Sequence, residues 1–155
     1  MANAHMTTFE CAVLTTTMIW CASCLGGSGD KAKPDDKTVK IEVLKPRDKE
    51  TISPAKEVSF EGSVSLEKNV PEPQILVFHM TKGKISYASL SLKVGDDNEL
   101  GRYVRQDASK YSFEFKVKTP DILGKFQIRV EGLYAEENLN VTRVNSPVST
   151  IEVKR

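Results

Sequence analysis

The stretch KEVSFEGSVSL, Lys56–Leu66, decides the fold, because apolar and polar residues alternate along most of its length. One face carries Val58, Phe60, Val64 and Leu66, and the other carries serines and glutamates. A period of two residues is typical of a β-strand with one face in the core and one face in solvent. The stretch therefore predicts a half-buried strand.

The same period recurs on both sides of this stretch. Six further strands are expected at TVKIEV (38–43), QILVFHM (74–80), SYASLSLKV (86–94), KYSFEFKVK (110–118), KFQIRVE (125–131) and VSTIEVK (148–154). Turn sequences rich in Gly, Pro, Asn and Asp separate them, and no segment keeps a helical period. About seven short strands with this spacing predict an all-β fold, an antiparallel β-sandwich.

Two of these strands carry further expectations. Residues 74–80 are apolar on both faces, which predicts a central strand that is covered on both sides. In residues 86–94, Leu90 and Val94 share one phase and Tyr87 has the other. That change of phase predicts a β-bulge near Ala88.

The order of these segments resembles a bacterial immunoglobulin-like (Ig-like) domain. The resemblance rests on IEVLKPRDKETISPAKEVSFEGSV (41–64), YSFEF (111–115), GKFQIRVEG (124–132) and SPVSTIEV (146–153), and it covers nearly all of residues 38–155. It implies an Ig-like β-sandwich. The carboxypeptidase-regulatory, transthyretin-like sandwich is the alternative, because that family is similar in EGSV (61–64) and DNELGRY (97–103).

Charge divides the 155-residue chain into three parts. Residues 1–23 contain one charged side chain, Glu10, and their apolar run 11–22 is shorter than the ~20 residues of a membrane-spanning helix. We expect a signal peptide-like leader at 1–23, a flexible linker at 24–37 and the Ig-like domain at 38–155.

The residues CASC (21–24), followed by LGGSG (25–29), resemble the lipobox of bacterial lipoproteins. Ala22 and Ser23 match the small residues before the acylated cysteine of that family, whereas Cys21 stands where the family usually has Leu. The resemblance implies that Cys24 is lipidated and that the protein is extracytoplasmic, membrane-anchored or secreted, in a cell envelope. The CxxC spacing leaves redox or zinc chemistry as one alternative, and an unprocessed N-terminus as another.

The residue types after the leader limit the chemistry of the domain. The net charge of +1 predicts no binding of nucleic acid. No cysteine follows Cys24, and His79 is the only histidine after the leader, so we expect no catalytic site and no cofactor. The acidic residues Asp96, Asp97 and Glu99 are interpreted as a solvated turn, with Ca²⁺ ligands as the alternative.

The expected function is therefore non-enzymatic. We expect a membrane-anchored domain that acts in adhesion, envelope structure or protein–protein interaction, with a protein partner that the sequence does not name. The alternative is a module that binds a carbohydrate or another small ligand. Its site residues would be Tyr87, Tyr103 and His79, with the tyrosines stacking on the ligand.

Overall fold

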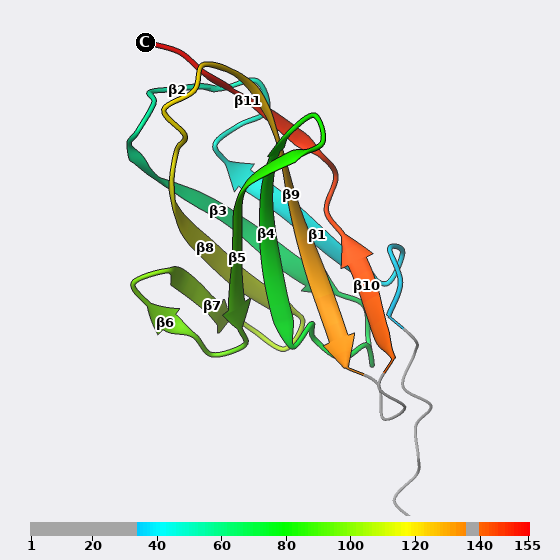
Figure 1. Cartoon of the computed structure of the whole chain (residues 1–155). Coiled ribbons are helices and arrows are strands. Elements are labelled where there is room, and N and C mark those ends of the chain that lie inside the picture. Colours follow the sequence, from blue (N-terminus) through cyan, green and yellow to red (C-terminus); the bar gives the residue numbers. More distant parts are fainter. Residues whose placement is uncertain (1–33, 136–139) are drawn as a thin grey trace, which may run out of the picture.

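The computed structural model describes residues 34–135 and 140–155 (Figure 1). All regular elements in these ranges are β-strands, and the strands form two sheets that pack face to face as a β-sandwich. Within the same ranges, no helix has the length and apolar character needed to cross a membrane. The expectation of an all-β sandwich is confirmed.

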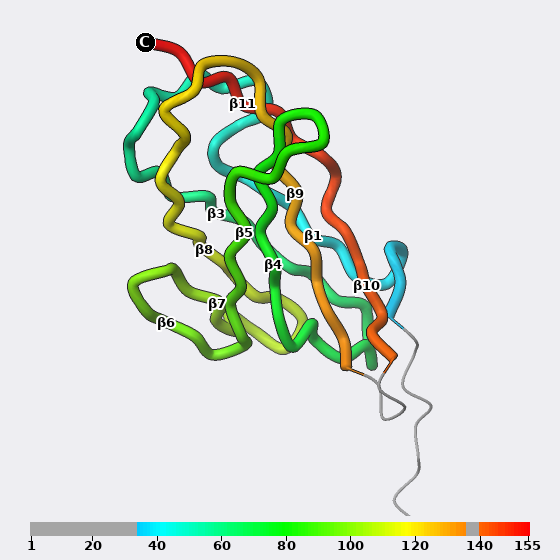
Figure 2. Tube along the Cα trace, viewed as in Figure 1, coloured from blue at the N-terminus to red at the C-terminus, as the bar shows by residue number. Residues whose placement is uncertain are grey.

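The two sheets differ in size. The first has five strands in the order β1 (Val39–Lys45), β3 (Glu57–Leu66), β8 (Lys110–Lys118), β7 (Gly101–Arg105) and β6 (Asp97–Asn98). The second has six strands: β2 (Thr51–Ile52), β11 (Ser149–Val153), β9 (Gly124–Ala135), β4 (Ile75–Lys82) and β5 (Ile85–Lys93) follow one another, and β10 (Val141–Asn145) also pairs with β9. In the tube view of Figure 2, the second sheet runs from β5 through β4 and β9 to β10.

All seven expected strands are present, as β1, β3, β4, β5, β8, β9 and β11. The structure adds four strands of two to five residues, which are β2, β6, β7 and β10. Pairing is antiparallel except between β2 and β11, which run parallel. These added strands were not predicted, because segments this short show too few alternations to reveal a period.

The core lies between the sheets and consists of the inward residues of each alternating strand. Phe60 from β3, Phe78 from β4 and Phe115 from β8 are fully buried at its centre. The ring centroids of Phe60 and Phe78 lie 4.8 Å apart, and those of Phe78 and Phe115 lie 5.5 Å apart. These contacts join the two sheets, because β4 belongs to one sheet and β3 and β8 belong to the other.

The expectation that residues 74–80 are covered on both sides was wrong. Strand β4 lies between β5 and β9, but only one of its faces is covered: Leu76 is buried, whereas Val77 on the outer face is partly exposed. Val94 follows the end of β5 and is 40% exposed, so it does not continue the inward phase of Leu92. The outer face of the second sheet is thus open along β4.

The predicted bulge is confirmed. The pairing of β4 with β5 shifts register between Met80 and Thr81, which lie opposite Ala88 and Ser86, so that Tyr87 has no partner across the strands. The extra residue reverses the phase of β5. As a result, Tyr87 turns inward and Ser86 turns to the open face.

Candidate functional site

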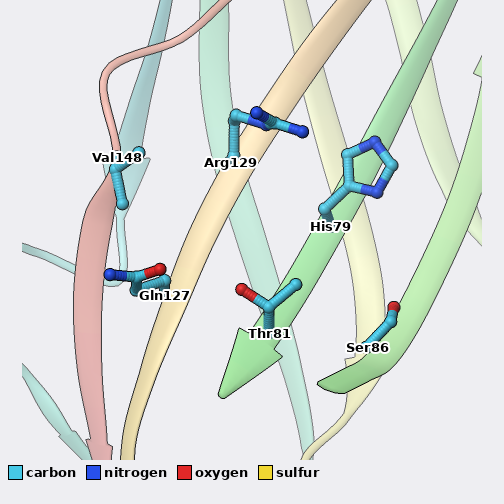
Figure 3. Close-up of a pocket in the computed structure, with 6 residues that line it drawn as sticks. All are labelled: His79, Thr81, Ser86, Gln127, Arg129 and Val148. Atoms are coloured by element: carbon cyan, nitrogen blue, oxygen red, sulfur yellow. The ribbon is translucent and has the colours of Figure 1, made fainter. Parts of the chain in front are cut away.

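A shallow polar pocket of about 240 Å³ lies on the open face of the second sheet (Figure 3). Its lining residues are His79, Thr81, Ser86, Gln127, Arg129 and Val148. They come from β4, β5, β9 and the connection between β10 and β11. In Figure 3 the guanidinium group of Arg129 extends toward the imidazole ring of His79.

Strand register brings the polar side chains of the pocket together. His79 pairs with Arg129 across β4 and β9, and Thr81 pairs with Gln127 one step further along. Directly paired residues of antiparallel strands project from the same face, with their Cβ atoms about 4.5–5.5 Å apart. Four polar side chains therefore converge on a small area, although some fifty positions of sequence separate the two strands.

The bulge of β5 completes the pocket. Ser86 lies opposite Thr81 because Tyr87 is skipped in the pairing. Without that extra residue, Ser86 would have the phase of Ala88 and Leu90, which pack against the core. The bulge thus adds a hydroxyl group to the open face at the edge of the sheet.

A buried carboxylate next to the pocket fixes the position of His79. The side chain of Glu131 is only 9% exposed, although it belongs to the outer face of β9. Its Oε1 accepts a hydrogen bond from Arg143 Nη1 at 3.3 Å, and its Oε2 lies 3.4 Å from His79 Nε2. An ionised carboxylate only accepts hydrogen bonds, so Nε2 is the nitrogen that carries the proton toward Glu131. The other ring nitrogen, Nδ1, has no partner among the described residues.

Arg143 forms an ion pair with the carboxylate of Glu131, whereas Arg129 has no carboxylate partner among the described residues. The described residues offer Arg129 neither a hydrogen bond nor an ion pair, and the nearby carboxylate of Glu131 is already shared by Arg143 and His79. The side chains of Thr81, Ser86 and Gln127 are equally without hydrogen bonds to described residues. The pocket therefore presents one cation and several neutral hydrogen-bonding groups to solvent.

The two tyrosines that were predicted to stack on a ligand do not line the pocket. Tyr103 is fully buried, and its hydroxyl donates a hydrogen bond of 3.1 Å to the carbonyl oxygen of Pro73. Burial also raises the pKa of Tyr103 above its ordinary value. Tyr87 packs edge-on against the core ring of Phe126, with the centroids 5.2 Å apart. The expectation that Tyr103 is exposed for stacking is therefore wrong, whereas Tyr87 is only partly buried, and of the three predicted ligand residues only His79 lines the pocket.

The acidic loop forms a turn. Asp96 accepts a hydrogen bond of 2.7 Å from the backbone N–H of Lys93, and Asp97 belongs to the two-residue strand β6. Glu99 lies in the turn between β6 and β7 and is exposed. Over residues 34–135 and 140–155, no three His, Cys, Asp or Glu side chains gather as a metal site would require. Cys24, the predicted lipidation residue, lies outside the described residues.

A second hollow, of about 460 Å³, lies beside β11 and is lined by Lys49, Lys125, Thr150, Ile151 and Glu152. Its charges are mixed, and Glu152 forms an ion pair of 2.8 Å with Lys154. This hollow is larger, and Lys49 and Lys125 also form no ion pair with the described residues, but Thr150 is its only neutral polar side chain, whereas three such side chains lie around Arg129. The pocket at His79 is therefore the better candidate for a binding site.

Sequence reasoning did not identify Arg129, Thr81, Ser86 or Gln127 as site residues. The available signal was alternation, which places Arg129 and Gln127 on the outer face of their strand. That signal does not say which outer-face residues of other strands lie beside them. Glu131 was missed for the same reason, because its burial arises from neighbours on β4 and β10.

Comparison of the chain with models of protein families gives no match, and comparison with curated proteins gives none either. The class that the structure defines is a β-sandwich protein with an open sheet face and a small polar pocket on that face.

Proposed function

We propose that the chain is a non-enzymatic, lipid-anchored, extracytoplasmic Ig-like domain that acts through protein–protein contact. The observation that supports this function best is the free edge of β5. Within residues 34–135 and 140–155 this strand pairs with β4 alone, and its residues 85–92 include no charged side chain. A strand edge of this kind exposes backbone N–H and C=O groups to which another strand can bind.

The other edges of the two sheets are protected. Strand β1 carries Lys40, Glu42 and Lys45, and β10 carries Arg143. The remaining edge strands, β2 and β6, have two residues each. Charged side chains and short edge strands are two of the devices by which proteins prevent pairing between molecules. Strand β5 has a bulge at Tyr87 and ends at the charged residue Lys93, but residues 88–92 between them have neither of these devices, which supports a contact along that segment.

A second copy of this chain is the partner that fits the β5 edge. Around a twofold axis at Leu90, the straight segment Ala88–Leu92 would pair antiparallel with itself, and no like charges would lie opposite one another. Ala88 and Leu90 are only partly buried in the single chain, so pairing would cover more of their apolar surface. Neighbouring anchored molecules would then be joined through one continuous sheet.

Ser89→Lys tests this contact. The full-length wild-type chain, kept reduced because it has three cysteines, is expected to form dimers as its concentration rises in sedimentation equilibrium. Lysine at this exposed position places a charge within the paired segment and should keep the protein monomeric. Thr51→Lys is the matched control, because it adds the same charge at the opposite edge of the same sheet and should leave dimerisation unchanged. A wild-type chain that stays monomeric at high concentration would contradict self-pairing.

Cys24→Ser tests the anchor. If Cys24 is acylated, the wild-type protein should sediment with membranes from a bacterial host that processes lipoproteins, since acyl chains supply the membrane affinity. The serine variant should move to the soluble fraction, with the far-ultraviolet circular dichroism of the purified domain unchanged. Cys21→Ser is the control and should remain with the membranes. Membrane sedimentation of the Cys24 variant equal to that of wild type would remove the anchor from the proposal.

A further inference from the structure

We propose that the pocket at His79 and Arg129 binds a small hydroxylated carboxylic acid, of the size of a single sugar acid. This binding site is separate from the β5 edge contact. The proposal rests on three features of the pocket: its charge, its hydrogen-bonding groups and its size.

The charge of the pocket favours one anionic group. Arg129 has no carboxylate partner among the described residues, while the charge of Glu131 is balanced by Arg143 and by the hydrogen bond from His79. A guanidinium group offers a planar pair of N–H donors that matches the two oxygens of a carboxylate. The carboxylate of the ligand would thus bind Arg129.

The neutral groups favour hydroxyl groups on the same ligand. Thr81 and Ser86 each offer a hydroxyl, and Gln127 offers an amide, so that these three side chains can both donate and accept hydrogen bonds. Nε2 of His79 lies 3.4 Å from Glu131 Oε2, which leaves Nδ1 as the ring nitrogen that can form a hydrogen bond with a hydroxyl group of the ligand. A ligand that carried only a carboxylate would leave these groups without partners.

The size of the pocket limits the ligand to a small molecule. A volume of about 240 Å³ lies below the 300–1,000 Å³ that is usual for drug-sized ligands. Water occupies about 30 Å³ per molecule, so the pocket has room for roughly eight waters or one monosaccharide-sized molecule. The side chain of Val148, which is 57% exposed, supplies an apolar wall for the carbon skeleton.

The experiment titrates the ¹⁵N-labelled full-length chain with glucuronate and follows backbone amide shifts at constant ionic strength. Glucuronate should cause saturable shifts at His79, Thr81, Ser86 and Arg129. Glucose lacks the carboxylate and acetate lacks the hydroxyl groups, so each should bind at least about tenfold more weakly. Shifts that do not saturate, or an affinity for acetate or glucose equal to that for glucuronate, would overturn the proposal.

Two variants locate the binding. Arg129→Gln removes the charge but keeps an N–H donor, so it should abolish the preference for glucuronate over glucose while the remaining spectrum stays that of the folded domain. Lys116→Gln is the matched control, because this exposed lysine lies on β8 of the other sheet and its loss changes the net charge equally. Glucuronate binding that survives Arg129→Gln, or that is lost in Lys116→Gln, would place the ligand elsewhere and refute the assignment.

Discussion

Phe78→Ala is expected to lower the free energy of unfolding by about 3–5 kcal/mol, the cost of removing a buried aromatic ring and leaving a cavity. Phe78 is fully buried and contacts Phe60 and Phe115 across the two sheets. Aromatic contacts of this kind contribute about 0.5–1.5 kcal/mol beyond the area that they bury. The measurement is equilibrium unfolding in urea, followed by far-ultraviolet circular dichroism.

A loss of this size is a large part of the roughly 5–15 kcal/mol that stabilises a typical domain. Phe78→Leu is therefore the companion variant, because it keeps most of the apolar volume and should lose less than the alanine variant while remaining folded. The control is Ile85→Ala, at the exposed start of β5, where the side chain is 60% exposed and the change should stay within about 0.5 kcal/mol. Equal losses for Phe78→Ala and Ile85→Ala would show that the core is not centred on this ring.

Gly62→Ala should be the second most damaging substitution, with an expected loss of about 3 kcal/mol from overpacking. A Cβ atom at Gly62 would overlap Cζ of Phe113, its partner on β8, and the backbone carbonyl oxygen of Glu42 on β1. The Phe113 ring is itself buried in the core, and the carbonyl belongs to the neighbouring strand, so neither atom can move without disturbing the sheet.

Gly95→Ala separates this steric cost from the cost of replacing any glycine. Gly95 has a φ of +89°, and a Cβ atom there would meet nothing within 4 Å. Its replacement should cost about 1–2 kcal/mol, from backbone strain alone. The two variants are compared by their midpoints and slopes in the same urea titration. If Gly62→Ala lost no more stability than Gly95→Ala, the close packing of Phe113 over β3 would be refuted.

Gly62 shows what the alternating pattern of the sequence can predict about the fold and what it cannot. In KEVSFEGSVSL, the glycine occupies an inward position between Phe60 and Val64, where alternation alone calls for an apolar side chain. The structure gives the reason: the ring of Phe113 occupies that space from the neighbouring strand. The exception in the pattern could be seen in the sequence, but its cause lies in a residue some fifty positions away.

Tyr103 shows the opposite case, a residue that was misjudged from its local context. It lies in GRYVR, between two arginines, in a segment too short to show a period. The pairing of β7 with β8 turns Tyr103 toward the core, where its ring lies 5.7 Å from that of Tyr111. Which side chains of a short strand are buried depends on the strand with which it pairs. That pairing depends in turn on how the whole sheet packs.

The sequence alone determined the seven main strands and most of their inward residues, since successive side chains of a strand point to opposite faces whatever its neighbours are. It also predicted the bulge of β5, because a change of phase is local. Only the tertiary structure decided which strands are neighbours and in what register. His79, Arg129 and Ser86 meet for that reason, and β5 is left as a free edge. Register is set by packing between distant segments, so no single segment contains it.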